Sequence, residues 1–113
     1  MPAKAGIHVF LNRARQMIEK IGWVYILTNR PNGVLYTGVT SDLIRRIAEH
    51  RAGQIAGFTQ RYGLKRLVYF ERHDDILAAI AREKAIKDWK RAYKTRLIMA
   101  TNPDWNDLYP GLL

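Results

Sequence analysis

Apolar and β-branched positions predict three strands along the chain. Residues 23–28 are aromatic and β-branched and lie between Gly22 and the turn-forming stretch 29–33, which predicts a strand followed by a turn. Residues 34–37 predict the returning strand, so the two segments would pair as a hairpin with a loop of about five residues. Residues 67–71 are apolar enough to predict a third strand.

Helical spacing of apolar residues predicts a helix directly after the hairpin. This helix would run to about residue 51, with Thr40 or Ser41 as its cap and Asp42 in its first turn. Residues 58–62 predict a short second helix between glycines 57 and 63.

A longer helical region is predicted after the third strand. It would begin at a cap, Asp74 or Asp75, and run over residues 76–89. Another helix is predicted from residue 90 or 92 to residue 100, and the sequence leaves open whether the two are continuous. Asn102 and the proline that follows it would stop this last helix, and the aromatic segment after it would fold back onto the body.

The length of 113 residues suits one domain with one modest core. We predict an N-terminal extension over residues 1–21, helical or flexible, then a domain over 22–108 and a tail over 109–113. Met17 is an alternative start, because the organised part begins near Trp23.

Charge and composition narrow the class of partner. Nineteen Lys and Arg stand against ten Asp and Glu, which gives a net charge of +9. This favours a polyanionic partner, nucleic acid ahead of an acidic membrane surface. The chain has no cysteine, which excludes disulfides and thiolate zinc sites. No apolar run approaches the roughly 18 residues of a membrane span, so we expect no membrane insertion and a cytoplasmic location.

Glu83 is the first candidate for chemistry, because it interrupts an apolar helix face. Ile76, Ile80 and Ile86 share that face at helical spacing. A carboxylate there is costly unless it is paired or binds a metal. A salt bridge, to Arg82, to Lys87 or to a more distant arginine, is the structural alternative.

Arg46 and His50 are the next candidates. They lie four residues apart on one helix and therefore on one face. An arginine suits phosphate, and a histidine can move a proton. For this helix taken alone, a solvated polar face explains both residues better.

Two tyrosines, Tyr25 and Tyr36, lie on the predicted hairpin strands. A strand tyrosine is commonly part of a core, and a phenol with a pKa of about 10 is a poor base at neutral pH. Either tyrosine could act if nearby cations favoured its phenolate or if it relayed a proton from an attacking water.

Taken together, these residues resemble the GIY-YIG nuclease superfamily, in particular its small stand-alone members of the UPF0213 or YhbQ-like type. The first motif corresponds to Val24-Tyr25-Ile26 and the second to Tyr36-Thr37-Gly38, with ten residues, 26–35, between the tyrosines. The family's arginine, histidine, glutamate and late asparagine correspond to Arg46, His50, Glu83 and Asn102. The resemblance covers about residues 22–108. It departs from the family where glycine and isoleucine of the first motif are replaced, and at Val39, where some branches carry a lysine.

The resemblance implies an α+β fold, with a three-stranded, mainly antiparallel sheet flanked by helices. It also implies hydrolysis of DNA phosphodiester bonds with one Mg²⁺ or Mn²⁺ held by Glu83, and no small-molecule cofactor. Arg46 would neutralise the transition state. We favour Tyr25 as the base and Tyr36 as the orienting residue, with His50 in the same cluster, although the sequence leaves this order open. Gly38 would let the backbone approach the phosphate.

A basic stretch extends the predicted DNA surface. Lys87, Lys90, Arg91 and Lys94 would share one helical face and follow the phosphates, with Asn102 as a further DNA contact. Trp89 within it could stack on a base, but we prefer a core position for it. No sequence-reading module is visible, so structure-selective cleavage in repair or recombination is expected, with dimerisation on the substrate left open.

Two other functions remain alternatives at the level of sequence. One is a nucleic-acid-binding module that keeps the scaffold without turnover. The other is a structural basic protein that binds RNA or a protein partner.

Overall fold

A computed structural model describes residues 20–113 of the chain. Within this range the strands are β1 (Gly22–Thr28), β2 (Leu35–Thr40) and β3 (Arg66–His73). The helices are α2 (Leu43–Arg51), α3 (Phe58–Tyr62), α4 (Ile76–Asp88), α5 (Arg91–Thr101) and the 3-10 turn η1 (Pro110–Leu112). The predicted N-terminal helix lies in residues 1–19, outside the described part.

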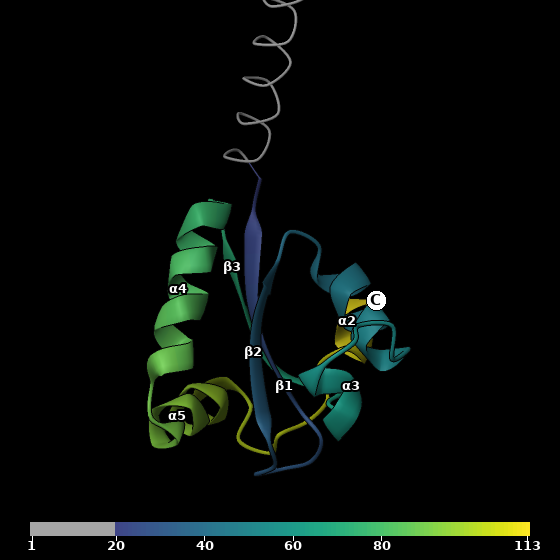
Figure 1. Ribbon diagram of the computed structural model, residues 1–113. Helices are drawn as coiled ribbons and strands as arrows, with labels where there is room; N and C mark the ends of the chain where they lie inside the picture. Colours follow the sequence, from purple (N-terminus) through teal and green to yellow (C-terminus); the bar gives the residue numbers. More distant parts are fainter. Residues whose placement is uncertain (1–19) are drawn as a thin grey trace, which may run out of the picture.

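The described strands form one antiparallel sheet in the order β2-β1-β3 (Figure 1). The register places Tyr25 opposite Gly38 on one side and opposite Phe70 on the other. A bulge interrupts the β1–β3 pairing between Ile26 and Leu27. The expected α+β fold, with a three-stranded antiparallel sheet flanked by helices, is confirmed.

Each face of the sheet carries its own apolar layer. Val24 and Ile26 pack with Ile86 and Ile98 on the face covered by α4 and α5. Tyr25 and Leu27 lie on the other face, which α2, α3 and the C-terminal segment cover (Figure 1). There they pack with Leu43, Ile47, Leu64 and Leu67. β2 is an edge strand of the sheet.

The helix boundaries refine the sequence predictions. Asp42 itself caps α2, where its carboxylate accepts the backbone N–H of Arg45 at 3.2 Å. The prediction of a Thr40 or Ser41 cap was therefore wrong, because the aspartate occupies the extended residue just before the first turn. Asp75 caps α4 and α3 spans residues 58–62, as predicted.

The C-terminal segment folds back onto the body as expected. Trp105 is buried in the layer beside α5, and the N–H of Leu108 donates to the carbonyl of Leu67 at 2.8 Å. Asp107 accepts a hydrogen bond from Arg51 at 2.7 Å. No helix within residues 20–113 combines the length and apolar character needed to cross a bilayer.

Candidate active site

A chain of polar contacts links β1, α2 and α3 beneath the sheet. The hydroxyl of Tyr25 lies 2.9 Å from Nε2 of His50, and Nδ1 of the same imidazole lies 3.0 Å from Oγ1 of Thr59. All three side chains are buried. Both nitrogens of His50 therefore have partners, and the ring is held in one orientation.

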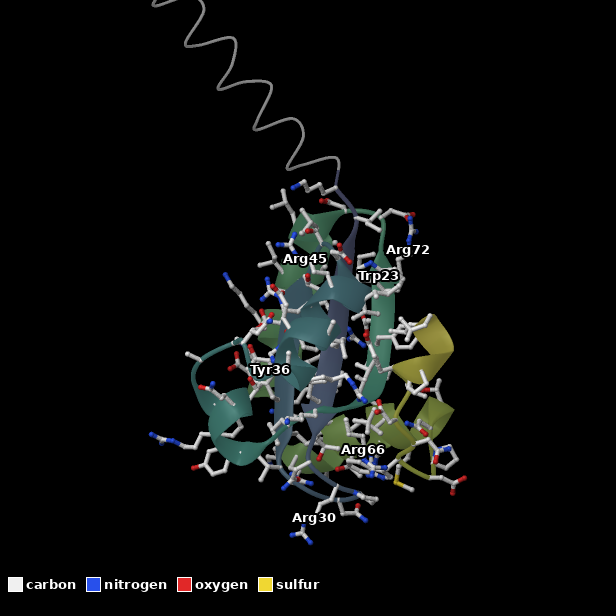
Figure 2. The ribbon with its side chains drawn as sticks, turned by 90° about the vertical axis from the view of Figure 1, so that its right-hand side faces the viewer. Trp23, Arg30, Tyr36, Arg45, Arg66 and Arg72 are labelled. Carbon is white, nitrogen blue, oxygen red and sulfur yellow. The ribbon has the colours of Figure 1, made fainter. Side chains whose placement is uncertain are left out.

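Tyr36 completes an aromatic cluster around this histidine. Its ring centroid lies 6.2 Å from that of Tyr25 and 5.8 Å from that of His50. Unlike Tyr25, it is only half-buried, at the edge strand β2. Figure 2 views this face of the sheet, with Tyr36 labelled near β2 and arginines Arg30, Arg45, Arg66 and Arg72 distributed around it. Tyr36 thus lies between the buried tyrosine and solvent.

Gly38 has a packing role that the sequence did not reveal. It is paired with Tyr25 across the strands, and a Cβ at position 38 would lie less than 3.0 Å from Cζ and Oη of that tyrosine. The missing side chain makes room for the Tyr25 ring. The approach of a phosphate to the backbone at Gly38 stays a prediction.

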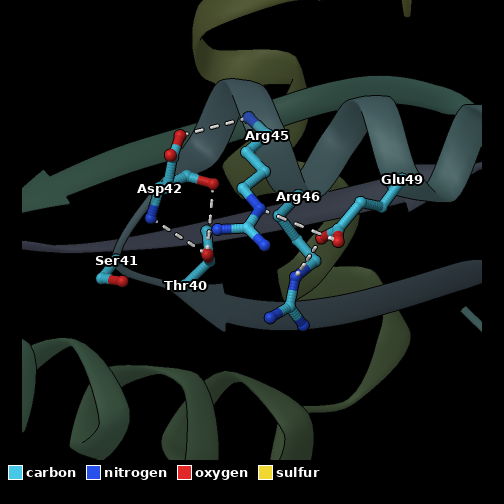
Figure 3. Close-up of a pocket in the computed structure, with 6 residues that line it drawn as sticks. All are labelled: Thr40, Ser41, Asp42, Arg45, Arg46 and Glu49. Carbon is cyan, nitrogen blue, oxygen red and sulfur yellow. Dashed lines mark hydrogen bonds and ion pairs between the residues drawn. The ribbon is translucent and has the colours of Figure 1, made fainter.

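Arg46 lies on α2, one turn before His50 and beside a surface cleft. The cleft has a volume of about 200 Å³ and is lined by Thr40, Ser41, Asp42, Arg45, Arg46 and Glu49 (Figure 3). Nε of Arg46 lies 3.4 Å from Glu49 Oε1, is buried, and makes no hydrogen bond within the described residues. The side chain as a whole is 42% exposed, so the guanidinium can meet an incoming anion.

Burial and charge set the protonation states of this cluster. Burial, reinforced by Tyr36, raises the pKa of Tyr25 far above its usual value, although the Arg46 guanidinium opposes the shift. Burial and then the Arg46 charge lower the pKa of His50, with Glu49 opposing. At neutral pH the phenol is therefore protonated and the imidazole is neutral, which is the pair that a proton relay needs.

Glu83 lies on α4, which packs on the face of the sheet opposite to the tyrosine cluster. Its side chain is 8% exposed and forms an ion pair with Lys87 on the next turn. That lysine also lies 5.9 Å from the ring centroid of Tyr36, which brings α4 and the tyrosine cluster together around β2. The hydrogen bond and charge of Glu83 raise the pKa of Lys87. The predicted buried position of Glu83 is confirmed, and so is the alternative that Lys87 pairs with it.

The donors present favour a hydrated hard cation over a fully enclosed metal. Within residues 20–113 no three His, Cys, Asp or Glu side chains converge. Glu83 contributes a single carboxylate, and Mg²⁺ commonly keeps several waters while binding one or two carboxylates and substrate phosphate. The residues are therefore compatible with Mg²⁺ or Mn²⁺ bound through Glu83.

The predicted common face of Lys87, Lys90, Arg91 and Lys94 was wrong. Trp89 and Lys90 are extended, with ψ of 148° and 147°, so α4 and α5 are separate helices. Arg91 donates to the carbonyl of Gly33 at 2.6 Å, and Lys94 donates to the carbonyl of Lys87 at 3.2 Å. Part of the predicted DNA surface thus ties α5 to the hairpin loop and to α4.

Trp89 itself packs against the apolar layer of α4 and α5, with the Arg82 guanidinium 5.1 Å from its ring centroid. Trp89 is partly buried against this layer, which agrees in part with the preferred core position.

Asn102 lies at the end of α5, where its amide serves the fold. Nδ2 donates to the carbonyls of Val68 and Asn106 at 3.1 and 2.9 Å, and Oδ1 accepts the N–H of Asn106 at 3.0 Å. The residue is buried. With its donors and its acceptor engaged, Asn102 fastens the C-terminal turn to β3 and has a structural role in place of the predicted DNA contact.

Thr59 is the site residue that sequence reasoning missed. It lies nine positions after His50 on a separate short helix. No periodicity or motif in the sequence connects the two residues, because a contact between two helices depends on the loop that joins them.

Residues 21–96 match the GIY-YIG catalytic domain. The chain belongs to the GIY-YIG family. This confirms the resemblance inferred from the two tyrosine motifs, and membership implies a nuclease domain with nucleic acid as its substrate.

Relatives place the chain near the UPF0213 proteins of this family. It is 43% identical over 76 residues to a UPF0213 protein of Natronomonas pharaonis, covering 67% of this chain and 88% of that one. To a UPF0213 protein of Serratia proteamaculans it is 33% identical over 76 residues, with coverages of 67% and 74%. The solution structure of the UPF0213 protein BH0048 of Bacillus halodurans is 31% identical, covers 77% of this chain and 92% of that one, and has a TM-score of 0.49.

Proposed function

We propose that this GIY-YIG protein is an endonuclease that hydrolyses phosphodiester bonds in DNA with one divalent metal ion. The observation that carries the proposal is the 2.9 Å contact between the Tyr25 hydroxyl and Nε2 of His50, next to the partly unpaired guanidinium of Arg46. A buried phenol and imidazole form a relay for a proton, and an arginine beside them suits a phosphate.

Arg46 would bind the scissile phosphate. Its guanidinium is already held in place by Glu49, so little reorganisation is needed when negative charge develops on the phosphate oxygens. The cleft beside it gives the anion a route from solvent. Tyr36, half-buried at the β2 edge, would orient the attacking water next to Tyr25.

The proton would move in two short steps. As the water oxygen bonds to phosphorus, its proton passes to the Tyr25 oxygen, while the phenolic proton passes to Nε2 of His50. The bond from phosphorus to the leaving 3′-oxygen then breaks, this oxygen takes a proton from solvent water to become a hydroxyl, and His50 later returns its proton to solvent. This route needs Nε2 of the resting histidine to be unprotonated, so Nδ1–H must donate to Oγ1 of Thr59, at 3.0 Å. The raised pKa of Tyr25 suits a relay in which no free phenolate accumulates.

Glu83 would hold the Mg²⁺ or Mn²⁺, which when bound supplies positive charge to the phosphate and to the leaving oxygen. The lysine that pairs with Glu83 is half-exposed, so its flexible stem can withdraw towards solvent and contact DNA.

Further parts of the proposal concern substrate and biological setting. The chain carries a net charge of +9, and no sequence-reading module is visible in it, which favours recognition of DNA structure over base sequence. We expect activity on branched, flapped or single-stranded DNA in repair or recombination in the cytoplasm, with dimerisation on the substrate as a way to extend the contact surface. The domain bounds of 22–108 stay a prediction.

A cleavage assay tests the proposal. Labelled single-stranded, duplex, flap and branched DNA would be incubated with Mg²⁺, Mn²⁺ or EDTA and with wild type, Tyr25→Phe or Glu83→Gln. Matched controls are Tyr69→Phe, whose hydroxyl bonds Glu71 away from the cluster, and Asp88→Asn at the exposed end of α4.

Metal-dependent cleavage that is lost in Tyr25→Phe and Glu83→Gln and kept in both controls would support the proposal. Cleavage that survives Glu83→Gln would overturn the metal assignment. Binding without cleavage of any substrate by wild type would overturn the enzyme assignment and favour a binding module.

A further inference from the structure

Helix α3 exposes two aromatic rings on its outer surface. Phe58 and Tyr62 are each 47% exposed, and their ring centroids lie 4.7 Å apart. In the described part of the chain one other aromatic side chain, Tyr93 on α5, is as exposed as these two. Two of the five residues of α3 thus present adjoining apolar rings to solvent, and adjoining exposed apolar groups are a feature of binding surfaces.

The surroundings of this pair are basic. Gly57, Phe58, Gln60, Arg61 and Tyr62 line an open hollow of about 460 Å³. Residues 50–70 contain Arg51, Arg61, Lys65 and Arg66 and no acidic residue, and Asp107 pairs with Arg51. Arg61 is exposed and forms no ion pair among residues 20–113. An aromatic pair with an available cation suits a polyanion that carries flat apolar groups, and does not suit a basic or neutral partner.

The inner side of the same short helix touches the candidate active site. Thr59, next to Phe58, contacts Nδ1 of His50 at 3.0 Å. Figure 1 shows α3 beside α2 on the sheet face that carries Tyr25 and Tyr36. A strand whose phosphate reaches the tyrosine cluster therefore has neighbouring bases within the range of the α3 surface.

Space at both ends of α3 allows a ligand to approach. Gly57 and Gly63 flank the helix with φ of 112° and 63°, and no atom lies within 4 Å of a Cβ built at either position. The positive φ angles let the chain turn sharply into and out of the helix.

We propose that α3 is a stacking platform for unpaired bases of the nucleic-acid strand that the active site cuts. Phe58 and Tyr62 stack on one or two bases, and Arg61 contacts the adjoining phosphate. The inference rests on the proposed nuclease function for the identity of the ligand, and it defines the substrate class as DNA with unpaired bases close to the scissile phosphate.

Binding without catalysis tests this platform. Fluorescence anisotropy in EDTA would measure the affinity of the full chain for a labelled oligothymidylate, for the same strand with single abasic sites, and for a duplex of equal length. The variants are Phe58→Ala with Tyr62→Ala, Phe58→Leu with Tyr62→Leu, and Arg61→Gln. Tyr93→Ala is the control for loss of an exposed ring elsewhere, and circular dichroism reports folding.

We expect the double alanine and double leucine variants to bind the single strand about 5- to 100-fold more weakly than wild type, since stacking on an aromatic ring contributes that much per base. An abasic site at the stacked position should lower the affinity of wild type by a similar factor. It should not lower the affinity of the double variants any further. Arg61→Gln should reduce the slope of log affinity against log salt by about 0.7. Tyr93→Ala should leave the single-strand affinity nearly unchanged. The duplex affinity should be nearly the same for wild type and the double variants.

Equal single-strand affinity of wild type and both folded double variants would overturn the platform. The platform would also be overturned if the double variants lost the same affinity for the abasic strand as for the intact strand. If the double variants kept their DNA affinity and instead lost a concentration-dependent dimer, the rings would be assigned to contact with a second copy of the chain. These results are separate from the cleavage assay. If the ring substitutions and the abasic site show coupled losses of affinity in a protein that cleaves no DNA, the platform is upheld and the nuclease proposal is refuted. If the protein cleaves DNA but shows no such coupling, the nuclease proposal is upheld and the platform is refuted.

Discussion

The hydroxyl of Tyr25 and Nε2 of His50 lie 2.9 Å apart although their residues are 25 positions apart in sequence, on β1 and α2. Both groups are buried, and each has a pKa shifted towards its neutral form. At neutral pH both the phenol and the imidazole are uncharged, so the resting site carries no charge on either group, and the imidazole is free to accept a proton from the phenol during the reaction.

Non-additive effects of mutating this pair are the first expected outcome. If Tyr25 and His50 form one relay, Tyr25→Phe and His50→Gln should each lower the single-turnover cleavage rate by about 10²–10⁴-fold, and the double variant should lose little more than either single one. The measurement is single-turnover cleavage of a flap substrate at saturating protein.

Tyr36→Phe serves as the comparison in this cycle, because the Tyr36 and His50 ring centroids lie 5.8 Å apart and no hydrogen bond among the described residues joins the two side chains. The fold-reductions in cleavage rate caused by Tyr36→Phe and by His50→Gln should therefore multiply in the double variant. Multiplicative effects of Tyr25→Phe and His50→Gln would argue against a shared proton path.

The pH dependence of cleavage follows from the lowered pKa of His50. The relay needs a neutral imidazole, so the rate should rise with pH through the pKa of His50 and then level off. Burial and the Arg46 charge place that pKa below the ordinary value of 6.5, so the acidic limb should lie below pH 6.5 and vanish in His50→Gln. Chemical shifts of the His50 ring protons would give the pKa directly.

The free energy of unfolding should also fall as the pH is lowered. Because the folded pKa of His50 is depressed, the unfolded chain binds this proton more readily. The stability that the neutral ring contributes is present above pH 6.5 and is lost as the pH falls towards the folded pKa. Urea unfolding of wild type and His50→Gln across this range would detect the difference, and an acidic limb above pH 6.5 would contradict the proposed protonation state.

The sequence predicted the element order and much of the fold, because local patterns encode it. Apolar runs bounded by turn residues marked β1 to β3, and a predicted cap at Asp74 or Asp75 marked the start of α4, where Asp75 is the cap. The break at Trp89 and Lys90 was left open, since neither residue is a helix breaker by propensity. Packing of the Trp89 ring against the apolar layer, rather than local preference, accompanies the turn between α4 and α5.

The candidate site was only partly visible in the sequence for a related reason. Tyr25, Tyr36, Arg46 and Glu83 followed from motif spacing. Their neighbours did not, because the partners of His50 and Asn102 depend on tertiary geometry. A buried asparagine that binds DNA and one that fastens a turn have the same sequence signal. Only the hydrogen bonds of Asn102 to Val68 and Asn106 distinguish them.

Replacing Thr59 should change the relay without touching the substrate. Thr59→Val keeps the shape and removes the hydroxyl beside Nδ1 of His50. We expect a loss of about 1 kcal/mol in the free energy of unfolding and a clear fall in rate, because the proton on Nδ1 loses its acceptor. Thr59→Ser should restore both. Nitrogen chemical shifts of His50 would report the tautomer, and an unchanged tautomer and pH profile in Thr59→Val would show that Thr59 only packs.

Gly38→Ala should damage the site through crowding. The new Cβ would lie less than 3.0 Å from the Tyr25 ring, and both strands are fixed by their ladder. We expect a loss of about 1–3 kcal/mol in stability together with reduced cleavage. The cost should shrink in a Tyr25→Ala background, where the ring is absent. Gly111→Ala, which meets no atom within 4 Å, is the control, and equal melting temperatures for both alanine variants would contradict the packing role.

Lys87 is expected to compete with a metal ion for Glu83. Its ammonium forms an ion pair with that carboxylate and is half-exposed, so the pair is partly screened by solvent. Lys87→Met should therefore lower the Mg²⁺ concentration for half-maximal cleavage by about two- to fivefold, the range of an exposed ion pair. Lys84→Met removes one charge from an exposed position on the same helix and should leave the Mg²⁺ dependence nearly unchanged. If both variants shift it equally, general electrostatics governs metal binding. If Lys87→Met raises the Mg²⁺ requirement, the lysine supports the carboxylate and does not compete for it.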